Sequence, residues 1–136
     1  MTPTAVALLG FVAWTIFLVA WLGVFRVSLA LSGKKKEPGF SPSGEDLEGF
    51  GRRLTRAHAN CYENLPVAGA VLLYAIATSQ TAITDEFALP FLSARFLQSL
   101  THLVSTSRPA VLVRFLLYIV QNVILVIWLL RLTHML

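Results

Sequence analysis

The sequence predicts an all-α integral membrane protein, a bundle of four helices, on three observations. Hydrophobic side chains make up 56% of the 136 residues and charged ones only 13%, which is too apolar for an ordinary soluble domain. Four stretches are long and apolar enough for a membrane crossing, which takes roughly 20 residues. The last three stretches are joined by short connections, as in antiparallel bundles. We therefore expect a single domain over 1–136, with helices at 3–31, 55–81, 87–106 and 109–134.

The first stretch is predicted to be a retained membrane helix. No Lys or Arg precedes its apolar run, which carries no charge from Ala5 to Phe25, whereas a secretory signal begins with a basic region. The segment 32–51 that follows is rich in Gly, Ser, Pro, Lys and Glu. Because this composition cannot bury enough apolar area to fold alone, we expect a mobile cytoplasmic loop there.

The remaining boundaries follow from turn and capping signals. The second connection is predicted around Thr84-Asp85-Glu86 and the third at 105–109. Ser107 is suited to cap the last helix, and Pro109 to its first turn, where the missing amide hydrogen costs nothing. Pro66 should weaken a backbone hydrogen bond and kink the second helix.

The distribution of charge predicts the orientation in the membrane. The second connection carries Asp85 and Glu86, whereas basic residues flank the first and third. The positive-inside rule therefore places the first and third connections in the cytoplasm and both termini on the opposite side, in a bacterial inner membrane or the endoplasmic reticulum. Nucleic-acid binding is not expected, because no soluble domain presents the basic residues. These are Lys34, Lys35, Lys36, Arg52, Arg53 and Arg108.

Each of the last three predicted helices carries one polar stripe at helical spacing. With the predicted topology, most of these groups share one leaflet, together with Arg26 near the end of the first helix. The second helix has Arg53, Arg56, Asn60 and Glu63, the third has Arg95, Gln98, Ser99 and His102, and the fourth has Arg114, Tyr118 and Gln121.

Two interpretations of the stripes stay open. Arginines near helix ends can extend to the interface and amides can cross-link helices, which accounts for Arg26, Gln98 or Asn122 taken singly. The whole set favours a bound polar ligand. Because arginines outnumber the lone carboxylate Glu63, that ligand should carry at least two anionic groups and an amine, as a small peptide does. No metal site is expected, since Cys61 is alone and the histidines lie on different segments.

The run from Arg56 to Pro66, with the pattern Arg-Ala-His-x-Asn-x-x-Glu-Asn-x-Pro, resembles the signature of the membrane-associated proteins in eicosanoid and glutathione metabolism (MAPEG). Ala94-Arg95 and Arg114-x-x-x-Tyr118 are also similar to this family. The resemblance implies a homotrimer that binds glutathione between protomers and takes a hydrophobic electrophile from the lipid.

The resemblance also implies roles for individual residues. Arg114 would be catalytic and stabilise the glutathione thiolate, since a free thiol has a pKa of about 8.5 and each unit of lowering takes about 1.4 kcal/mol. Arg53, Arg56 and Arg95 would bind carboxylates, Asn60 the peptide backbone and Glu63 the amine. The other residues expected to bind glutathione are Arg26, His58, Asn64, His102 and Tyr118.

Departures from the family's branches favour one activity. Asn64 after Glu63 is typical of the type 1 microsomal glutathione transferases, Phe115 stands where the prostaglandin E synthase branch has a serine, and His102 takes the place of a tyrosine. We therefore expect a glutathione transferase, with glutathione peroxidase activity, rather than a leukotriene or prostaglandin synthase. The alternative is a non-catalytic trimeric protein that binds glutathione or serves a structural role. A transporter has little support without broken helices or repeats.

Overall fold

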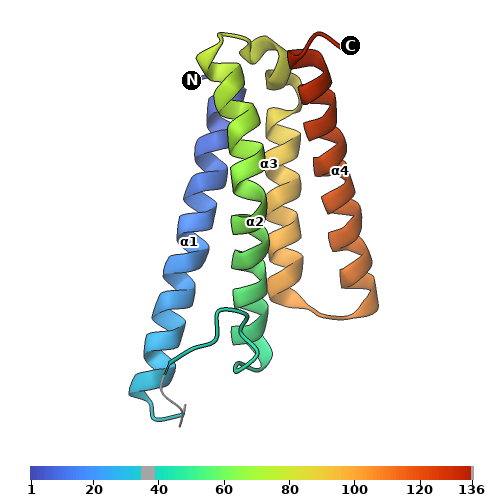
Figure 1. The fold of residues 1–136 in the computed structure, drawn as a ribbon. Coiled ribbons are helices and arrows are strands. Elements are labelled where there is room, and N and C mark those ends of the chain that lie inside the picture. The colour runs from blue at the N-terminus through green and yellow to red at the C-terminus, as the bar shows by residue number, and fades with distance from the viewer. Residues whose placement is uncertain (35–38, 136) are drawn as a thin grey trace.

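The computed structural model describes residues 1–34 and 39–135, which form four long helices and no strand (Figure 1). The all-α prediction is confirmed for this part of the chain. In chain order the helices are α1 (Pro3–Leu31), α2 (Gly49–Ala77), α3 (Thr81–Val104) and α4 (Arg108–Leu132).

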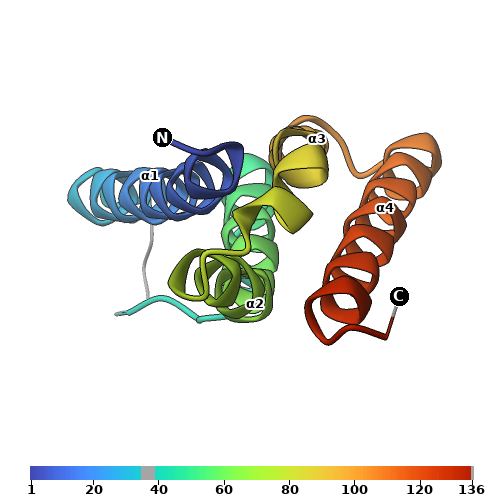
Figure 2. The same cartoon turned by 90° about the horizontal axis from the view of Figure 1, so that it is seen from above.

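The four helices are not equally packed. α1, α2 and α3 all contact one another, whereas α4 packs almost entirely on α3 and does not touch α1. Seen from above, α4 stands apart at the side of the other three (Figure 2). Both termini and the α2–α3 connection lie at one end of the bundle, and the other two connections lie at the opposite end (Figure 1). The face of α4 toward α2 is thereby left largely uncovered.

A row of aromatic rings joins the helices near the end that carries the termini. Phe11 of α1 meets Phe91 of α3 with ring centroids 6.2 Å apart, and Phe91 meets Trp128 of α4 at 5.4 Å. All three side chains are buried. In a membrane, apolar side chains gain little free energy when they leave lipid for the contact between two helices. Close packing of the side chains is therefore a main source of helix association. Trp128 therefore fixes α4 to α3.

The predicted connection at Thr84-Asp85-Glu86 is wrong, because these residues lie inside α3. The turn is at 78–80 instead, between the end of α2 and Thr81. The reason is a contact that local pattern does not show. The Asp85 carboxylate accepts hydrogen bonds from the backbone N–H of Thr4, at 2.9 Å, and from its hydroxyl, at 2.6 Å. Asp85 thus satisfies the first turn of α1 from within a helix.

At the other end of the bundle, α2 begins at Gly49 rather than at the predicted residue 55. Leu54 is fully buried and the α2 backbone at Gly51 lies against the Phe25 ring of α1, so this turn is part of the helix packing. The last helix begins as predicted, since Ser107 caps it by accepting from the N–H of Ala110 at 3.5 Å.

The described part of the first connection packs on the helices, in contrast to the predicted mobile loop. Leu47 is 5% exposed, and Gly44, at φ +72°, lies directly against Thr55 of α2. Arg26 Nη2 donates to the Ser41 carbonyl at 3.1 Å. The loop gains these contacts from the neighbouring helices, which composition alone does not reveal. Two of the basic residues used to predict the orientation, Lys35 and Lys36, lie outside the described residues.

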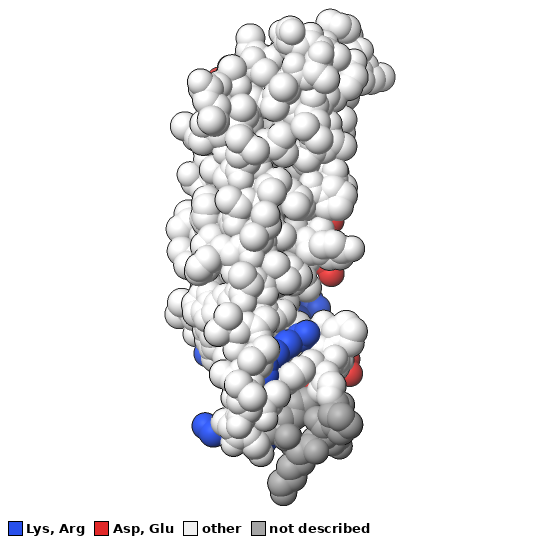
Figure 3. Space-filling view, turned by 90° about the vertical axis from the view of Figure 1, so that its left-hand side faces the viewer, with Lys and Arg blue, Asp and Glu red and all other residues white. Residues whose placement is uncertain are grey.

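The outer surface suits a membrane. α1 and α4 are long and apolar enough to cross one, and most of their outward side chains are apolar. On the face that carries α1, basic side chains gather toward the end with the first and third connections (Figure 3). α2 and α3 are more polar, so their crossing stays a prediction, as does the orientation of the bundle.

Gly44→Ala is expected to release the loop from α2. A Cβ at this position would lie 2.8 Å from Thr55 Cβ, and a residue other than Gly in this left-handed conformation costs about 1–2 kcal/mol. Limited proteolysis of the protein in detergent should show faster cleavage within 39–48.

Gly33→Ala is the matched control, because Gly33 also has a positive φ, +66°, but meets no atom within 4 Å. It should leave the cleavage rate close to that of the wild type. Equal rates for the two variants would show that the contact with Thr55 does not hold the loop.

Candidate functional site

Two adjoining cavities open between α2, α3 and α4 near the end with the first and third connections. The cavity further from this end of the bundle, called the inner cavity, has a volume of about 420 Å³. The cavity nearer this end, called the outer cavity, has a volume of about 430 Å³. Both are lined by Arg56, His102 and Arg114, so they form one continuous site. The inner cavity is completed by Asn60, Gln98, Val111, Phe115 and Tyr118, and the outer cavity by Gly49, Arg52, Arg53 and Thr106.

The site is strongly cationic. Four arginines line it, and no carboxylate does among the residues that the structure describes. Arg56 is exposed and has no hydrogen bond or ion pair within the described chain. Arg53 is anchored, because its Nε donates to the Leu103 carbonyl at 2.7 Å. Guanidinium groups gathered without a counter-charge favour an anionic ligand with more than one acidic group.

Arg114 is held by α3 at two points. Its Nη1 lies 2.9 Å from Nδ1 of His102, and its backbone carbonyl accepts from Gln98 Nε2 at 3.3 Å. Gln98 also accepts from Nε2 of Gln121 at 2.9 Å, which ties α4 to α3 a second time. Since a guanidinium only donates, Nδ1 of His102 is the acceptor and the imidazole hydrogen is on Nε2.

Arg95, which is predicted to bind the ligand, lines neither cavity of the single chain. It is 1% exposed, and its Nη1 donates to Asn60 Oδ1 at 2.5 Å. Its guanidinium lies 5.1 Å from the ring centre of Phe11, and its Nε has no partner in the described chain. The Arg95 side chain extends into the contact between α1, α2 and α3, where it holds Asn60 in the inner cavity wall.

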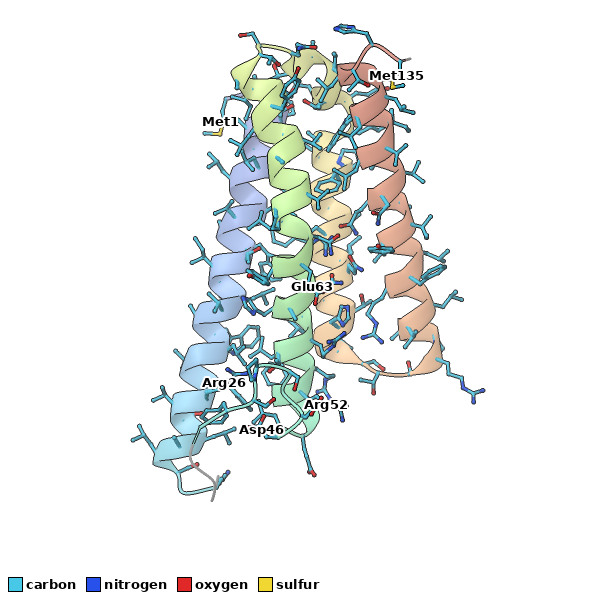
Figure 4. All side chains as sticks on the ribbon, in the orientation of Figure 1. Met1, Arg26, Asp46, Arg52, Glu63 and Met135 are labelled. Carbon is cyan, nitrogen blue, oxygen red and sulfur yellow. The ribbon has the colours of Figure 1, made fainter. Side chains whose placement is uncertain are left out.

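Four other predicted residues also lie outside the cavity walls. Arg26 contacts the first connection, and His58 stacks on Tyr62 with ring centroids 6.3 Å apart. Asn64 donates to the carbonyl of Asn60 at 2.9 Å. Glu63 is exposed, further along α2 than Arg52 (Figure 4). The structure therefore brings together five of the predicted residues, namely Arg53, Arg56, Asn60, His102 and Tyr118, around the predicted catalytic Arg114.

Sequence reasoning left out several residues of the site. Arg52 lies four residues before Arg56, a spacing that puts both on one helical face and would have signalled it. Gln98 was expected, taken singly, to cross-link helices, and it does so by hydrogen bonds to Arg114 and Gln121 of α4. Val111 gave no signal, because apolar residues are common on any membrane helix, and Thr106 lies in the connection between α3 and α4, outside the polar stripes. Phe115 was noted only as a departure from one branch of the family.

The cavity walls offer cations, amides and hydroxyls but no thiol. Cys61 is buried and its Sγ lies 3.2 Å from Ser99 Oγ, away from both cavities. Over residues 1–34 and 39–135, no three His, Cys, Asp or Glu side chains are placed to hold a metal ion. The arrangement is thus suited to binding and polarising an anion.

Comparison with known proteins gives one match. A model of the MAPEG family matches residues 4–133, almost the whole chain. Among curated proteins and solved structures, none matches the chain.

Arg95→Ala is expected to lower the stability of the folded protein by about 1–3 kcal/mol, because Asn60 loses its charged partner inside the bundle. Thermal unfolding in detergent, followed by circular dichroism, measures the change. Arg56→Ala is the control, since this exposed side chain has no hydrogen bond to lose and should stay within about 0.5 kcal/mol of the wild type. If both variants unfold alike, the Arg95 contacts are not structural.

Proposed function

Because the chain belongs to the MAPEG family, which includes membrane glutathione transferases and eicosanoid synthases, we propose that it is a membrane-bound glutathione transferase. The observation that supports this most is the pair of adjoining cavities lined by Arg52, Arg53, Arg56 and Arg114. Glutathione has two carboxylates, one ammonium and one thiol, so its charge suits a site with several guanidinium groups.

Side chains of the site would serve most groups of this ligand. Arg53 and Arg56 would bind its carboxylates, with Arg52 adding positive charge at the outer end. Asn60, whose Oδ1 is held by Arg95, would bind the peptide backbone. Glu63 follows Asn60 by one turn on the same face of α2 and would receive the ammonium group, beyond the inner cavity wall.

Glutathione supplies the thiol sulfur that forms the new bond to the electrophile; the thiol proton passes to solvent, and in a substitution the leaving group of the electrophile departs as an anion. Arg114 lines both cavities and uses one N–H on His102, so its other donors are available to an anion. Its guanidinium would stabilise the thiolate over the thiol. In a partly dry site this lowers a thiol pKa by about one to two units, each worth about 1.4 kcal/mol. Arg114 is therefore the proposed catalytic residue.

The second substrate would be a hydrophobic electrophile. Val111 and Phe115 form apolar wall beside Arg114 in the inner cavity, and both are on the exposed side of α4. An apolar molecule dissolved in lipid would reach Arg114 along this side. A hydroperoxide that entered in the same way would be reduced to an alcohol and water while two glutathione molecules are oxidised to their disulfide, which is the proposed second, peroxidase activity.

A homotrimer is part of the proposal. α4 is covered mainly by α3, and α1 and α4 each present a row of exposed apolar side chains. Neighbouring copies would cover these faces and close the open side of the cavities. The runner-up function, a glutathione-binding protein without catalysis, is favoured by one observation: Glu63 lies outside the cavities of the single chain.

Purified protein is expected to conjugate glutathione to an activated chloroaromatic electrophile, and Arg114→Ala should lower the rate at least about tenfold, the effect of one pKa unit. Formation of the coloured thioether measures the rate. Arg108→Ala is the control, because Arg108 is exposed at the same end and lines neither cavity.

The outcomes separate the two functions. Glutathione binding without catalysis above buffer would leave only the binding protein. Absence of both would mean that the polar stripes are structural.

Glu63→Gln is expected to weaken glutathione binding more than Cys61→Ala, because only the first removes a charge that would face the ammonium group. Isothermal titration calorimetry with glutathione measures both. Cys61 is buried against Ser99, so its replacement should leave the affinity near that of the wild type. Equal losses would contradict the role given to Glu63.

A further inference from the structure

We propose that Gln98 and His102, one turn apart on α3, are positioning residues that fix the place of Arg114 in the site. Gln98 holds the backbone of Arg114 and His102 holds its guanidinium. This inference rests on the proposed function, in which Arg114 acts on the glutathione thiol. It gives His102 a role different from the ligand contact that the family resemblance implies.

The backbone contact sets the position of α4. The Arg114 carbonyl accepts from Gln98 Nε2, while Gln98 Oε1 accepts from Gln121 Nε2 two turns further along α4. Gln98 is 2% exposed and Gln121 1%. Buried amides in an apolar bundle are costly unless they are paired, so the hydrogen bonds of Gln98 Nε2, Gln98 Oε1 and Gln121 Nε2 favour one rotation and one height of α4 against α3. Only Gln121 Oε1 has no partner among the described residues. Arg114 is thereby placed where its side chain lines both cavities.

The side-chain contact then orients the guanidinium. An arginine side chain has many rotamers, and the Arg114 contact at 2.9 Å to Nδ1 of His102 selects among them. Gln98 and His102 are four residues apart, so they lie on the same face of α3. The contact requires a neutral imidazole, because an imidazolium has no acceptor and would repel Arg114.

The position of the contact between His102 and Arg114 indicates its role. His102 and Arg114 both line the inner and the outer cavity, so their contact lies where the two cavities meet. Arg56 lines both as well, and Phe115 forms apolar wall on the inner side. A guanidinium fixed there stands between the carboxylate-binding arginines and the path of the electrophile. Donors that are already oriented stabilise a developing anion without rearrangement, which is how such groups accelerate reactions.

The test compares His102→Leu with His102→Asn in the full-length protein. Asparagine places its Oδ1 near the position of Nδ1 and can accept from Arg114, whereas leucine cannot. Ultraviolet absorbance of the thiolate, recorded against pH with bound glutathione, measures the thiol pKa. His102→Leu should return this pKa toward that of free glutathione and lower kcat about tenfold for each unit. His102→Asn should keep most of both, and KM for glutathione should change little in either.

Thr101→Val serves as the matched control, because Thr101 precedes His102, bonds only within α3 and lines neither cavity. It should match the wild type. Should His102→Leu not fold, His102→Gln replaces it, since its acceptor stands one bond further from the backbone and should restore less than asparagine does.

The results distinguish the two levels of the proposal. A wild type that binds glutathione and forms the thiolate, with a leucine variant equal to it, would overturn the positioning role and leave the transferase standing. Loss of glutathione affinity in both the leucine and the asparagine variant would mean that His102 contacts the ligand directly, which also overturns it. A wild type that forms no thiolate would overturn the transferase and the positioning role together.

Discussion

The site depends on the hydrogen bonds that the polar stripe of α3 makes to α2 and α4. In an apolar bundle a polar side chain is stable only with a partner, so a stripe on one helix must find acceptors and donors on others. Arg95 finds Asn60 on α2, and His102 finds Arg114 on α4. α3 therefore holds the site residues of α2 and α4 in place, while α2 and α4 supply the groups that a ligand would meet.

Because α4 packs mainly on α3, the site between α2 and α4 stays open. Trp128 and Gln121 fix α4 to α3, and nothing comparable joins it to α2. Near the end with the first and third connections, α2 and α4 therefore leave cavities between them, whereas closer to the termini both helices contribute to one hydrophobic core. The same arrangement exposes apolar faces on α1 and α4 that lipid or further copies of the chain would cover. The unequal packing of α4 thus accounts both for the accessible site and for the uncovered apolar faces of the single chain.

The charged residues also differ between the interior of the bundle and its open end. The buried cation, Arg95, is compensated by an amide and an aromatic ring. The exposed cations at the open end, such as Arg52 and Arg56, have no acidic partner among the described residues. Mutual repulsion among them disfavours the empty site and is relieved by an anion. Stability is therefore provided inside the bundle, and binding capacity at its open end.

The sequence by itself determined four helices, the capping of the last by Ser107, the polar stripes and, through the motif around Asn60 and Glu63, the family. Periodicity assigns a side chain to a face of its own helix. It does not say which helix that face meets, and so Arg95 was expected at a ligand and lies in the protein interior. The start of α3 was misplaced for a related reason, because Asp85 is satisfied by Thr4, a residue distant in sequence. Only the tertiary structure decided which polar groups pair with each other and which stay free for a ligand, since partners on different helices are chosen by packing.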